Sequence, residues 1–239
     1  MKPYYEQDGI VIYHGDCREV LPTLEPESVS SIVTDPPYGM DLQPQRGKTK
    51  AIEGDVQRFA KSLWYGSAPF WSRVLESDTA SVFFGRWSEE WAKALLSEWF
   101  TVKDCIVWVK NNFGLGYYTR PQWELAWYVH KGTPPTPEQA GSNVWDFRKV
   151  MDQVHSCEKP VPLLRRAIEV CGGNGVILDP FMGSGTTLRA AKDLGRRAIG
   201  IEIEERYCEI AANRLRQGVL FGSDEHLTPA PEAAPNGPR

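Results

Sequence analysis

The chain of 239 residues lacks several features that would assign it to a function class at once. It has no long apolar run, so no membrane-spanning segment is predicted, and its first residues contain no apolar signal core. Its 27 basic residues are outnumbered by 31 acidic ones, which gives a net charge of −4. This balance argues against a protein that is basic as a whole, although a local basic stripe would be sufficient for nucleic-acid binding.

Cysteines are few, odd in number and scattered, without the close pairs that are typical of a zinc site. The five are Cys17, Cys105, Cys157, Cys171 and Cys208. We therefore expect reduced thiols in a cytoplasmic protein and predict no metal centre.

The most informative stretch is a short apolar run, residues 29–33, that ends in a double proline. Pro36 and Pro37 fix two φ angles and remove two amide donors, so the predicted strand must end in a stiff turn. The turn displays the Asp35 carboxylate, the Pro36 carbonyl and the ring of Tyr38. In open α/β sheets, ligands bind at such carboxyl ends of strands.

A planar base with an exocyclic amino group would fit this turn. Asp35 and the Pro36 carbonyl could each accept one amino hydrogen, and Tyr38 offers a ring for stacking. Two acceptors outside the base plane would pull the nitrogen toward tetrahedral geometry and free its lone pair for attack. The alternative is a strand-terminating turn whose Tyr38 simply packs.

Residues 40–65 are polar and follow the turn directly. We expect a mobile loop that closes over the substrate, with Arg46, Lys48 and Lys50 as DNA contacts. A solvated loop without a role is the alternative. Trp123 is a candidate for lining a base pocket, although most of the nine tryptophans should be core residues.

A second informative stretch, residues 176–187, reads VILDPFMGSGTT. A buried strand delivers Asp179, and a glycine turn then opens a helix at Thr186, which makes a cradle for a polar or anionic group. It is neither a phosphate loop nor a complete dinucleotide fingerprint. The next predicted strand, residues 197–201, ends in Glu202, which is placed to accept ribose hydroxyls. Together these residues predict a site for an adenosine-like cofactor with a charged, carboxylate-bearing tail.

Three motifs resemble those of S-adenosylmethionine-dependent DNA amino-methyltransferases: DPPYG at Asp35–Gly39, HSCEKP at His155–Pro160 and LDPFMGSGTT at Leu178–Thr187. Their order resembles that of the circularly permuted β-group. The resemblance covers about residues 9–217 and implies the class I methyltransferase fold, an α/β, Rossmann-like, seven-stranded and mostly parallel sheet with helices on both faces. The residue patterns separately suggest seven strands.

The resemblance implies that Asp35, Pro36, Pro37 and Tyr38 form the catalytic turn around a base extruded from the duplex. It also implies an S-adenosylmethionine site, with Glu202 on the ribose, Asp16 near the adenine and Lys159 beside the methionine part. The implied cofactor-binding set is Asp16, Cys17, Asp35, Lys159, Asp179, Phe181, Gly183, Ser184, Gly185, Thr186 and Glu202.

The expected function is methylation of the N6 amino group of adenine in DNA, because an aspartate at the head of the turn resembles the adenine-modifying members. Cytosine N4 methylation and a catalytically silent subunit that binds DNA or a partner stay open as alternatives. Carbon-5 methylation is not expected, since no cysteine follows a proline.

We expect one domain over residues 1–221, a disordered tail over 222–239 and a short recognition segment over 131–154. A segment this short favours a short or relaxed recognition site. The oligomeric state stays open, a homodimer included.

Overall fold

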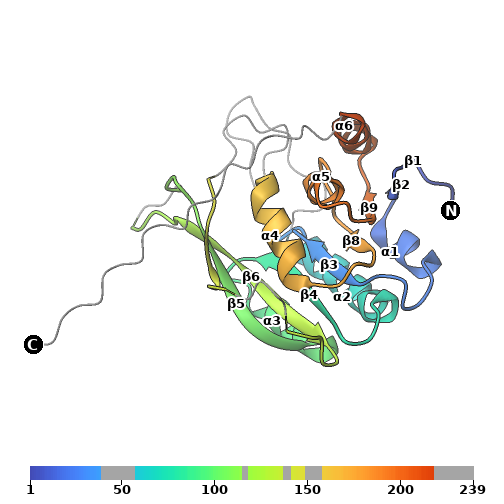
Figure 1. Cartoon of the computed structure of the whole chain (residues 1–239). Helices are drawn as coiled ribbons and strands as arrows, with labels where there is room; N and C mark the ends of the chain where they lie inside the picture. Colours follow the sequence, from blue (N-terminus) through green and yellow to red (C-terminus); the bar gives the residue numbers. More distant parts are fainter. Residues whose placement is uncertain (39–56, 115–117, 137–140, 149–157, 218–239) are drawn as a thin grey trace, which may run out of the picture.

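The computed structural model describes residues 1–38, 57–114, 118–136, 141–148 and 158–217 (Figure 1). Within them, nine strands form one sheet in the order β1-β2-β9-β8-β3-β4-β6-β5-β7. The strands are β1 (Tyr5–Gln7), β2 (Ile10–His14), β3 (Ser31–Thr34), β4 (Thr79–Gly85), β5 (Thr101–Val109), β6 (Trp123–Lys131), β7 (Val144–Asp146), β8 (Ile177–Asp179) and β9 (Ala198–Glu202).

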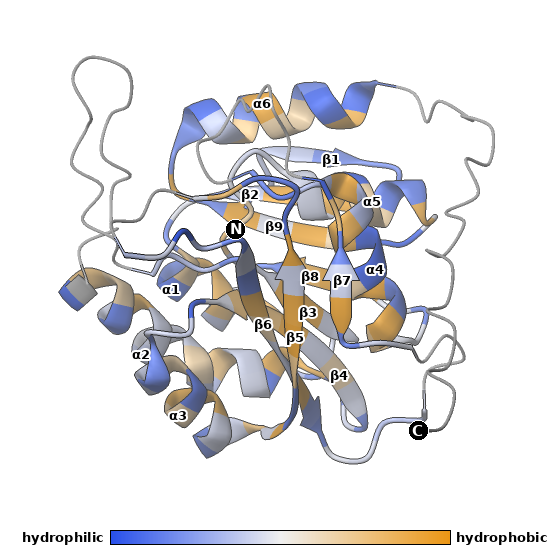
Figure 2. Ribbon diagram, turned by 90° about the vertical axis from the view of Figure 1, so that its left-hand side faces the viewer, coloured by the Kyte–Doolittle hydropathy of each residue, from blue (hydrophilic) through white to orange (hydrophobic). Residues whose placement is uncertain are grey.

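Helices cover both faces of the sheet (Figures 1 and 2). One face carries α4 (Val161–Cys171), α5 (Thr186–Asp193) and α6 (Glu205–Arg216). The other carries α1 (Cys17–Val20), a 3₁₀ turn at Leu21–Thr23, α2 (Gln57–Val74) and α3 (Glu90–Trp99). Each helix turns an apolar stripe to the strands and a polar side to water, as Figure 2 shows for α6, so two cores form.

The core beneath α2 and α3 is aromatic. Trp64 and Trp71 of α2 are fully buried against Phe83 of β4, and Trp127 of β6 closes the cluster from the sheet. Five of the nine tryptophans are buried, as expected for core residues. This cluster lies directly under the end of β3 and supports the turn that follows it.

The strands β2, β9, β8, β3 and β4 are parallel, so their carboxyl ends share one edge of the sheet. From β3 the chain continues through α2 to β4 on one side, whereas from β8 it continues through α5 to β9 on the other. The strand order therefore reverses between β3 and β8. Such switch points open a crevice at the carboxyl edge.

The α/β class and the mostly parallel sheet are confirmed, but the strand count of seven is wrong. The structure adds β1, which pairs with β2 through a two-residue turn at Asp8 and Gly9 with φ of +53° and +76°. An Asp-Gly pair between two apolar runs is a strong hairpin signal, so this strand was detectable. The other addition, β7, pairs only three residues with β5 at the far edge.

The predicted mobile loop over 40–65 is wrong in its second part, because α2 already begins at Gln57. Residues 40–56 lie outside the described ranges, as does the predicted tail over 222–239. The described part of segment 131–154 starts at the end of β6 and includes β7. Across the described ranges, no helix combines the length and the apolar character that crossing a membrane requires.

Candidate active site

The turn after β3 is tied down by side chains, since its two prolines offer no amide donors. The Tyr38 hydroxyl donates to one carboxylate oxygen of Asp35, and the Lys159 ammonium donates to the other. From α2, the indole of Trp64 donates to the Pro37 carbonyl at 3.1 Å. The Pro36 carbonyl accepts no hydrogen bond from the described part of the chain. One acceptor of the turn is thus left open beside a fixed carboxylate.

Charges alternate behind this carboxylate. Lys159 lies between Asp35 and Glu124, with its ammonium 3.2 Å from a Glu124 oxygen, and Lys110 pairs with the other Glu124 oxygen at 2.9 Å. Burial acts to raise the pKa of Glu124, but the charges of Lys159 and Lys110 outweigh it and lower that pKa to about 2. Burial raises the pKa of Asp35 to about 6, against the opposing pull of Lys159. At neutral pH both carboxylates are ionised.

The second predicted loop leaves β8 beside the first. Asp179 is buried and accepts hydrogen bonds from the Thr34 hydroxyl at 2.7 Å and from the Phe181 amide at 3.1 Å. Because Thr34 ends β3, this carboxylate holds the two strand ends together. Asp179 is therefore engaged mainly by the protein itself.

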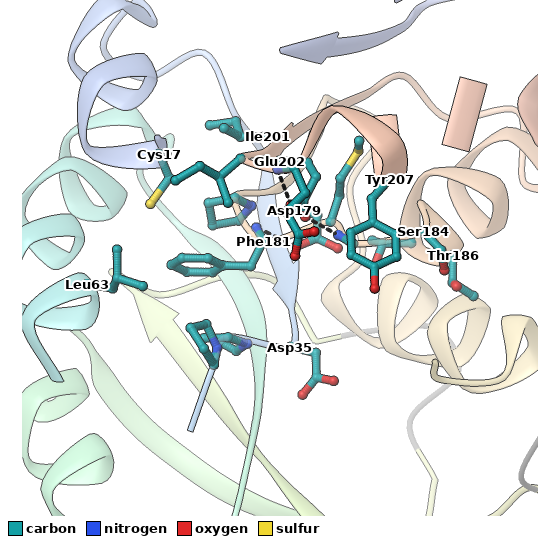
Figure 3. Close-up of a pocket in the computed structure, with 18 of the residues that line it drawn as sticks. Cys17, Asp35, Leu63, Asp179, Phe181, Ser184, Thr186, Ile201, Glu202 and Tyr207 are labelled. Atoms are coloured by element: carbon teal, nitrogen blue, oxygen red, sulfur yellow. Dashed lines mark hydrogen bonds between the residues drawn. The ribbon is translucent and has the colours of Figure 1, made fainter. Parts of the chain in front are cut away.

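The glycine turn before α5 is shaped by close packing. Gly185 has a φ of +78°, and a Cβ there would lie 2.6 Å from the Cβ of Ala211 on α6. A glycine is the residue that tolerates both conditions. The turn consequently sits tightly against α6, and Ser184 and Thr186 face the crevice from it (Figure 3).

Glu202 ends β9 across from this turn. Its two carboxylate oxygens accept the Gly183 amide at 3.0 Å and the Glu204 amide at 2.8 Å. Burial raises the pKa of Glu202 to about 7, although these amides act to lower it. The group is poised to respond to hydroxyl donors in the crevice, which favour its ionised form.

Asp16 and Cys17 follow β2 at the same edge. Asp16 caps α1 by accepting the Arg18 amide at 2.8 Å, and the Arg18 guanidinium also donates to it. Hydrogen bonding from Arg18 lowers the pKa of Asp16. Burial raises the pKa of Cys17 to about 12, so its thiol stays protonated and is no nucleophile at neutral pH.

These groups line one cavity of about 220 Å³ at the switch point (Figure 3). Asp35 faces it from β3, and Ser184, Thr186 and Tyr207 face it from the side of α5 and α6. The predicted residues that it brings together are Asp16, Cys17, Asp35, Pro36, Pro37, Tyr38, Lys159, Asp179, Phe181, Gly183, Ser184, Thr186 and Glu202.

Two predicted residues do not line the cavity. Gly185 packs on α6, and Trp123 lies at the start of β6 with 42% of its surface exposed. The three candidate DNA contacts Arg46, Lys48 and Lys50 lie outside the described ranges. Their assigned roles stay predictions.

Sequence reasoning missed several contributors. Tyr207 of α6 lines the cavity, as do Phe59 and Leu63 of α2. Glu124 was overlooked beside Trp123, and a carboxylate between apolar residues at the start of the strand was the available signal. Nothing local to Trp64 reveals that its indole reaches Pro37.

A cofactor with a ribose and an amino-acid tail is compatible with this cavity. The Glu202 carboxylate provides the acceptor for hydroxyls, and the wall is otherwise largely apolar with polar groups at a few points. Among the described residues, no group of three or more His, Cys, Asp or Glu side chains is arranged to hold a metal ion.

Comparison with known proteins identifies a family that fits this cavity. Residues 29–213 match a family model described as DNA methylase. YubD of Escherichia coli (strain K12) is 32% identical over 209 residues, which cover 84% of this chain and 88% of that protein. DNA adenine methyltransferase YhdJ of the same organism is 28% identical over 92% of this chain and 87% of its own length. The crystal structure of the M1.HpyAVI–SAM complex superposes with a TM-score of 0.67 at 28% identity, covering 86% of this chain and 99% of that one.

Proposed function

Since the chain belongs to the DNA methylase family and therefore uses S-adenosylmethionine to methylate amino groups in DNA, we propose that its target is the N6 amino group of adenine. The observation that carries methyl transfer to a base amino group is the cavity shared by the Asp35–Tyr38 turn and the Gly183–Glu202 pair. The choice of adenine rests on the aspartate at the head of that turn. The family name covers N6 and N4 methylation alike. The similarity to YhdJ, a DNA adenine methyltransferase that aligns along most of its length, supports adenine.

The cavity is proposed to divide into two parts. Glu202 would accept the ribose hydroxyls of the cofactor, with Asp16 near its adenine and Lys159 near its amino-acid tail. Residues Phe181, Gly183, Ser184 and Thr186 would form the wall of this cofactor part, and the Asp35–Tyr38 turn would form the part that holds the base. Bound there, S-adenosylmethionine supplies a sulfonium methyl group, which is electrophilic without help from the protein.

The catalytic turn would act on the base. A base inside a duplex is out of reach, so it must be extruded, at a cost of about a few kcal/mol. Stacking on Tyr38 would return about 1–3 kcal/mol of this. Asp35 and the Pro36 carbonyl would accept the two amino hydrogens, which orients the nitrogen lone pair toward the cofactor. Asp35 then lies where it can take up the proton that leaves the nitrogen.

Lys159 would help to keep the Asp35 carboxylate ionised, because its positive charge lowers the pKa of that group. In the structure the ammonium occupies one oxygen of Asp35, and Glu124 holds the same ammonium from behind. An amino group arriving at Asp35 would compete for that oxygen, and Glu124 offers Lys159 a second carboxylate. Glu124 and Lys110 are proposed as positioning residues for this exchange.

The test is incubation with tritiated S-adenosylmethionine and unmethylated DNA, followed by nucleoside analysis. We expect label in 6-methyladenine. Label in 4-methylcytosine would overturn the choice of adenine, and no label on any DNA would instead favour a silent binding subunit.

Asp35→Ala serves as the active-site control. It should lower kcat by at least about 10²–10³-fold, the usual effect of removing a preorganised polar group. Cofactor affinity, measured by calorimetry, should change little. Normal methylation by this variant would refute the role given to Asp35.

A further inference from the structure

The carboxyl edge of the sheet continues beyond the catalytic turn, away from the cofactor cavity. β4, β6, β5 and β7 follow β3 in that order. In Figure 1, β5 and β6 lie on the opposite side of α4 from β8 and β9. Five residues stand where these strands reach the edge, and we call them the aromatic–basic rim: Arg86, Trp87, Arg120, Trp123 and Arg148.

The pairing of the strands places the rim residues beside one another. Gly85, the last residue of β4, is opposite Leu125 of β6, so Trp87 and Trp123 each lie two positions further toward the edge. Trp123 is in turn opposite Val109, the last residue of β5, and Val109 is opposite Asp146 at the end of β7. Trp87 and Trp123 therefore lie at the ends of neighbouring strands on the same edge of the sheet.

The rim tryptophans are exposed in a protein that buries most of its indoles. Trp87 is 72% exposed and Trp123 is 42% exposed. Phe113, from the connection between β5 and β6, adds a further exposed ring at 56%. Large apolar side chains gathered at one exposed edge usually mark a binding surface.

The three arginines of the rim are exposed as well, and among the described residues none of them forms a salt bridge. Arg120 stacks on the ring of Phe113 at 5.4 Å. Glu124 is balanced by Lys110 and Lys159. Asp146 is exposed at the same edge, so the guanidinium groups act as separate points of positive charge rather than as a uniform field.

The rim adjoins the catalytic charges. Trp123 directly precedes Glu124, whose carboxylate holds Lys159 against Asp35. The ammonium of Lys159 also lies over the ring of Phe84, one residue before the end of β4. The rim thus lies one residue along the chain from a side chain that contacts the charges of the turn.

We propose that the aromatic–basic rim binds DNA next to the extruded base, and this inference rests on the proposed function. The indoles of Trp87 and Trp123 stack on bases exposed by the extrusion, and the arginines contact phosphates. Aromatic rings with interspersed guanidinium groups fit unstacked nucleic acid, because every base has a face to stack and every nucleotide a phosphate. An acidic chain needs such a local surface to hold DNA.

The chain contains a matched control. Trp99 ends α3 just before β5 begins, at the opposite edge of the sheet, and its exposure of 40% is close to that of Trp123. Trp87→Ala, Trp123→Ala and Trp99→Ala are compared by fluorescence anisotropy on an unmethylated duplex. Loss of a stacking ring should weaken DNA binding about tenfold in the first two. Trp99→Ala should stay within about twofold of the wild type, and calorimetry should show unchanged cofactor affinity in all three.

A second arm tests the charges. Arg86→Gln, Arg120→Gln and Arg148→Gln alter only exposed side chains, so folding should persist. Each should reduce the slope of log Kd against log salt by about one unit if it removes one phosphate contact. Slopes equal to that of the wild type, with rim tryptophan variants that bind DNA like Trp99→Ala, would overturn the proposal. So would a wild type without measurable DNA affinity.

The two proposals fail in different ways. If the wild type labels adenine and the rim variants bind DNA normally, the rim is wrong and the activity stands. If the rim variants lose DNA binding and the wild type labels no base, the surface stands and the proposed methylation is wrong.

Discussion

Burial in the protein shifts the pKa values of individual carboxyl groups at the cavity. Glu202 is the clearest case, because burial raises its pKa to about 7 while both of its oxygens accept backbone amides. The ionised form accepts hydroxyl donors, whereas the protonated form must give up part of that capacity. Cofactor binding should therefore be linked to pH in the neutral range.

The pH dependence follows from the raised pKa. A carboxyl group with a folded-state pKa near 7 loses its charge as the pH falls through that value. Affinity for S-adenosylmethionine should consequently drop about tenfold between pH 8 and pH 6. Isothermal calorimetry at several pH values measures this change in the Kd of the cofactor.

Glu202→Gln is the control for that experiment, since an amide keeps the shape but does not titrate. Its affinity should be low and flat across the same range. A wild type with an equally flat profile would show that Glu202 is not the group that senses the cofactor.

At the scale of elements, α2 does more than cover the sheet. Trp64 reaches from this helix to the Pro37 carbonyl, so the position of the proposed catalytic turn depends on a side chain 27 residues away. Trp71, two turns further along the same face of α2, is equally buried, but its indole nitrogen has no partner among the described residues. The two tryptophans differ mainly in that one hydrogen bond.

Trp64→Phe should lower kcat by about 10–10²-fold, because a turn displaced by even an ångström misplaces the base. The KM for S-adenosylmethionine should stay nearly constant. Trp71→Phe removes the same volume from the same cluster and should leave kcat within about twofold, since it breaks no hydrogen bond. Steady-state kinetics of the two variants decide, and equal losses in both would mean that packing alone is responsible.

The contact between α5 and α6 gives an element-scale prediction of stability. At Gly185 an alanine meets Ala211 at 2.6 Å and must also adopt a positive φ, so Gly185→Ala should destabilise the protein by about 2–4 kcal/mol. Gly195 has a similar φ of +65° with nothing within 4 Å of an added Cβ. Gly195→Ala should cost only about 1 kcal/mol. Urea unfolding measures the difference, and equal losses would show that the close approach is relieved by a shift of α6.

The helices and strands also show which parts of the fold could be predicted from the sequence. Periodicity and turn residues located seven strands, because those signals are local, whereas the first half of α2 was expected to be a loop. The β7 strand was missed, since three residues at an edge have no pattern of their own and depend on β5 as a partner.

At the scale of the whole molecule, the site depends on distances along the chain that no motif contains. Asp35 and Lys159 are 124 residues apart, and Thr34 and Asp179 are 145 apart. The sequence identified Asp35 and Asp179, and the resemblance added Lys159, but Thr34 was missed and neither pair was foreseen. Glu124 shows the limit best, because its importance comes entirely from the two lysines that the fold brings to it.

Because the cavity collects loops from four neighbouring strands, its ligand should stabilise the fold as a unit. S-adenosylmethionine at a hundred times its Kd should add about 2.7 kcal/mol and raise the Tm by about 5–10 °C for a domain of this size. Thermal scanning with and without the cofactor measures the shift. Glu202→Ala at the same concentration should show a clearly smaller one, and an identical shift would mean that the stabilising contacts lie elsewhere.

The pairing of β2 with β9 has a consequence for protein synthesis. Ile10 of β2 lies opposite Ala198 of β9. A strand that is synthesised among the first residues must therefore wait for a partner strand that is synthesised near the last. A nascent chain that has left the ribosome only halfway already contains the Asp35 turn but has nowhere to hold a methyl donor. An interrupted translation product is therefore inert toward the genome, and the ability to modify DNA arises only when nearly all of the message has been read.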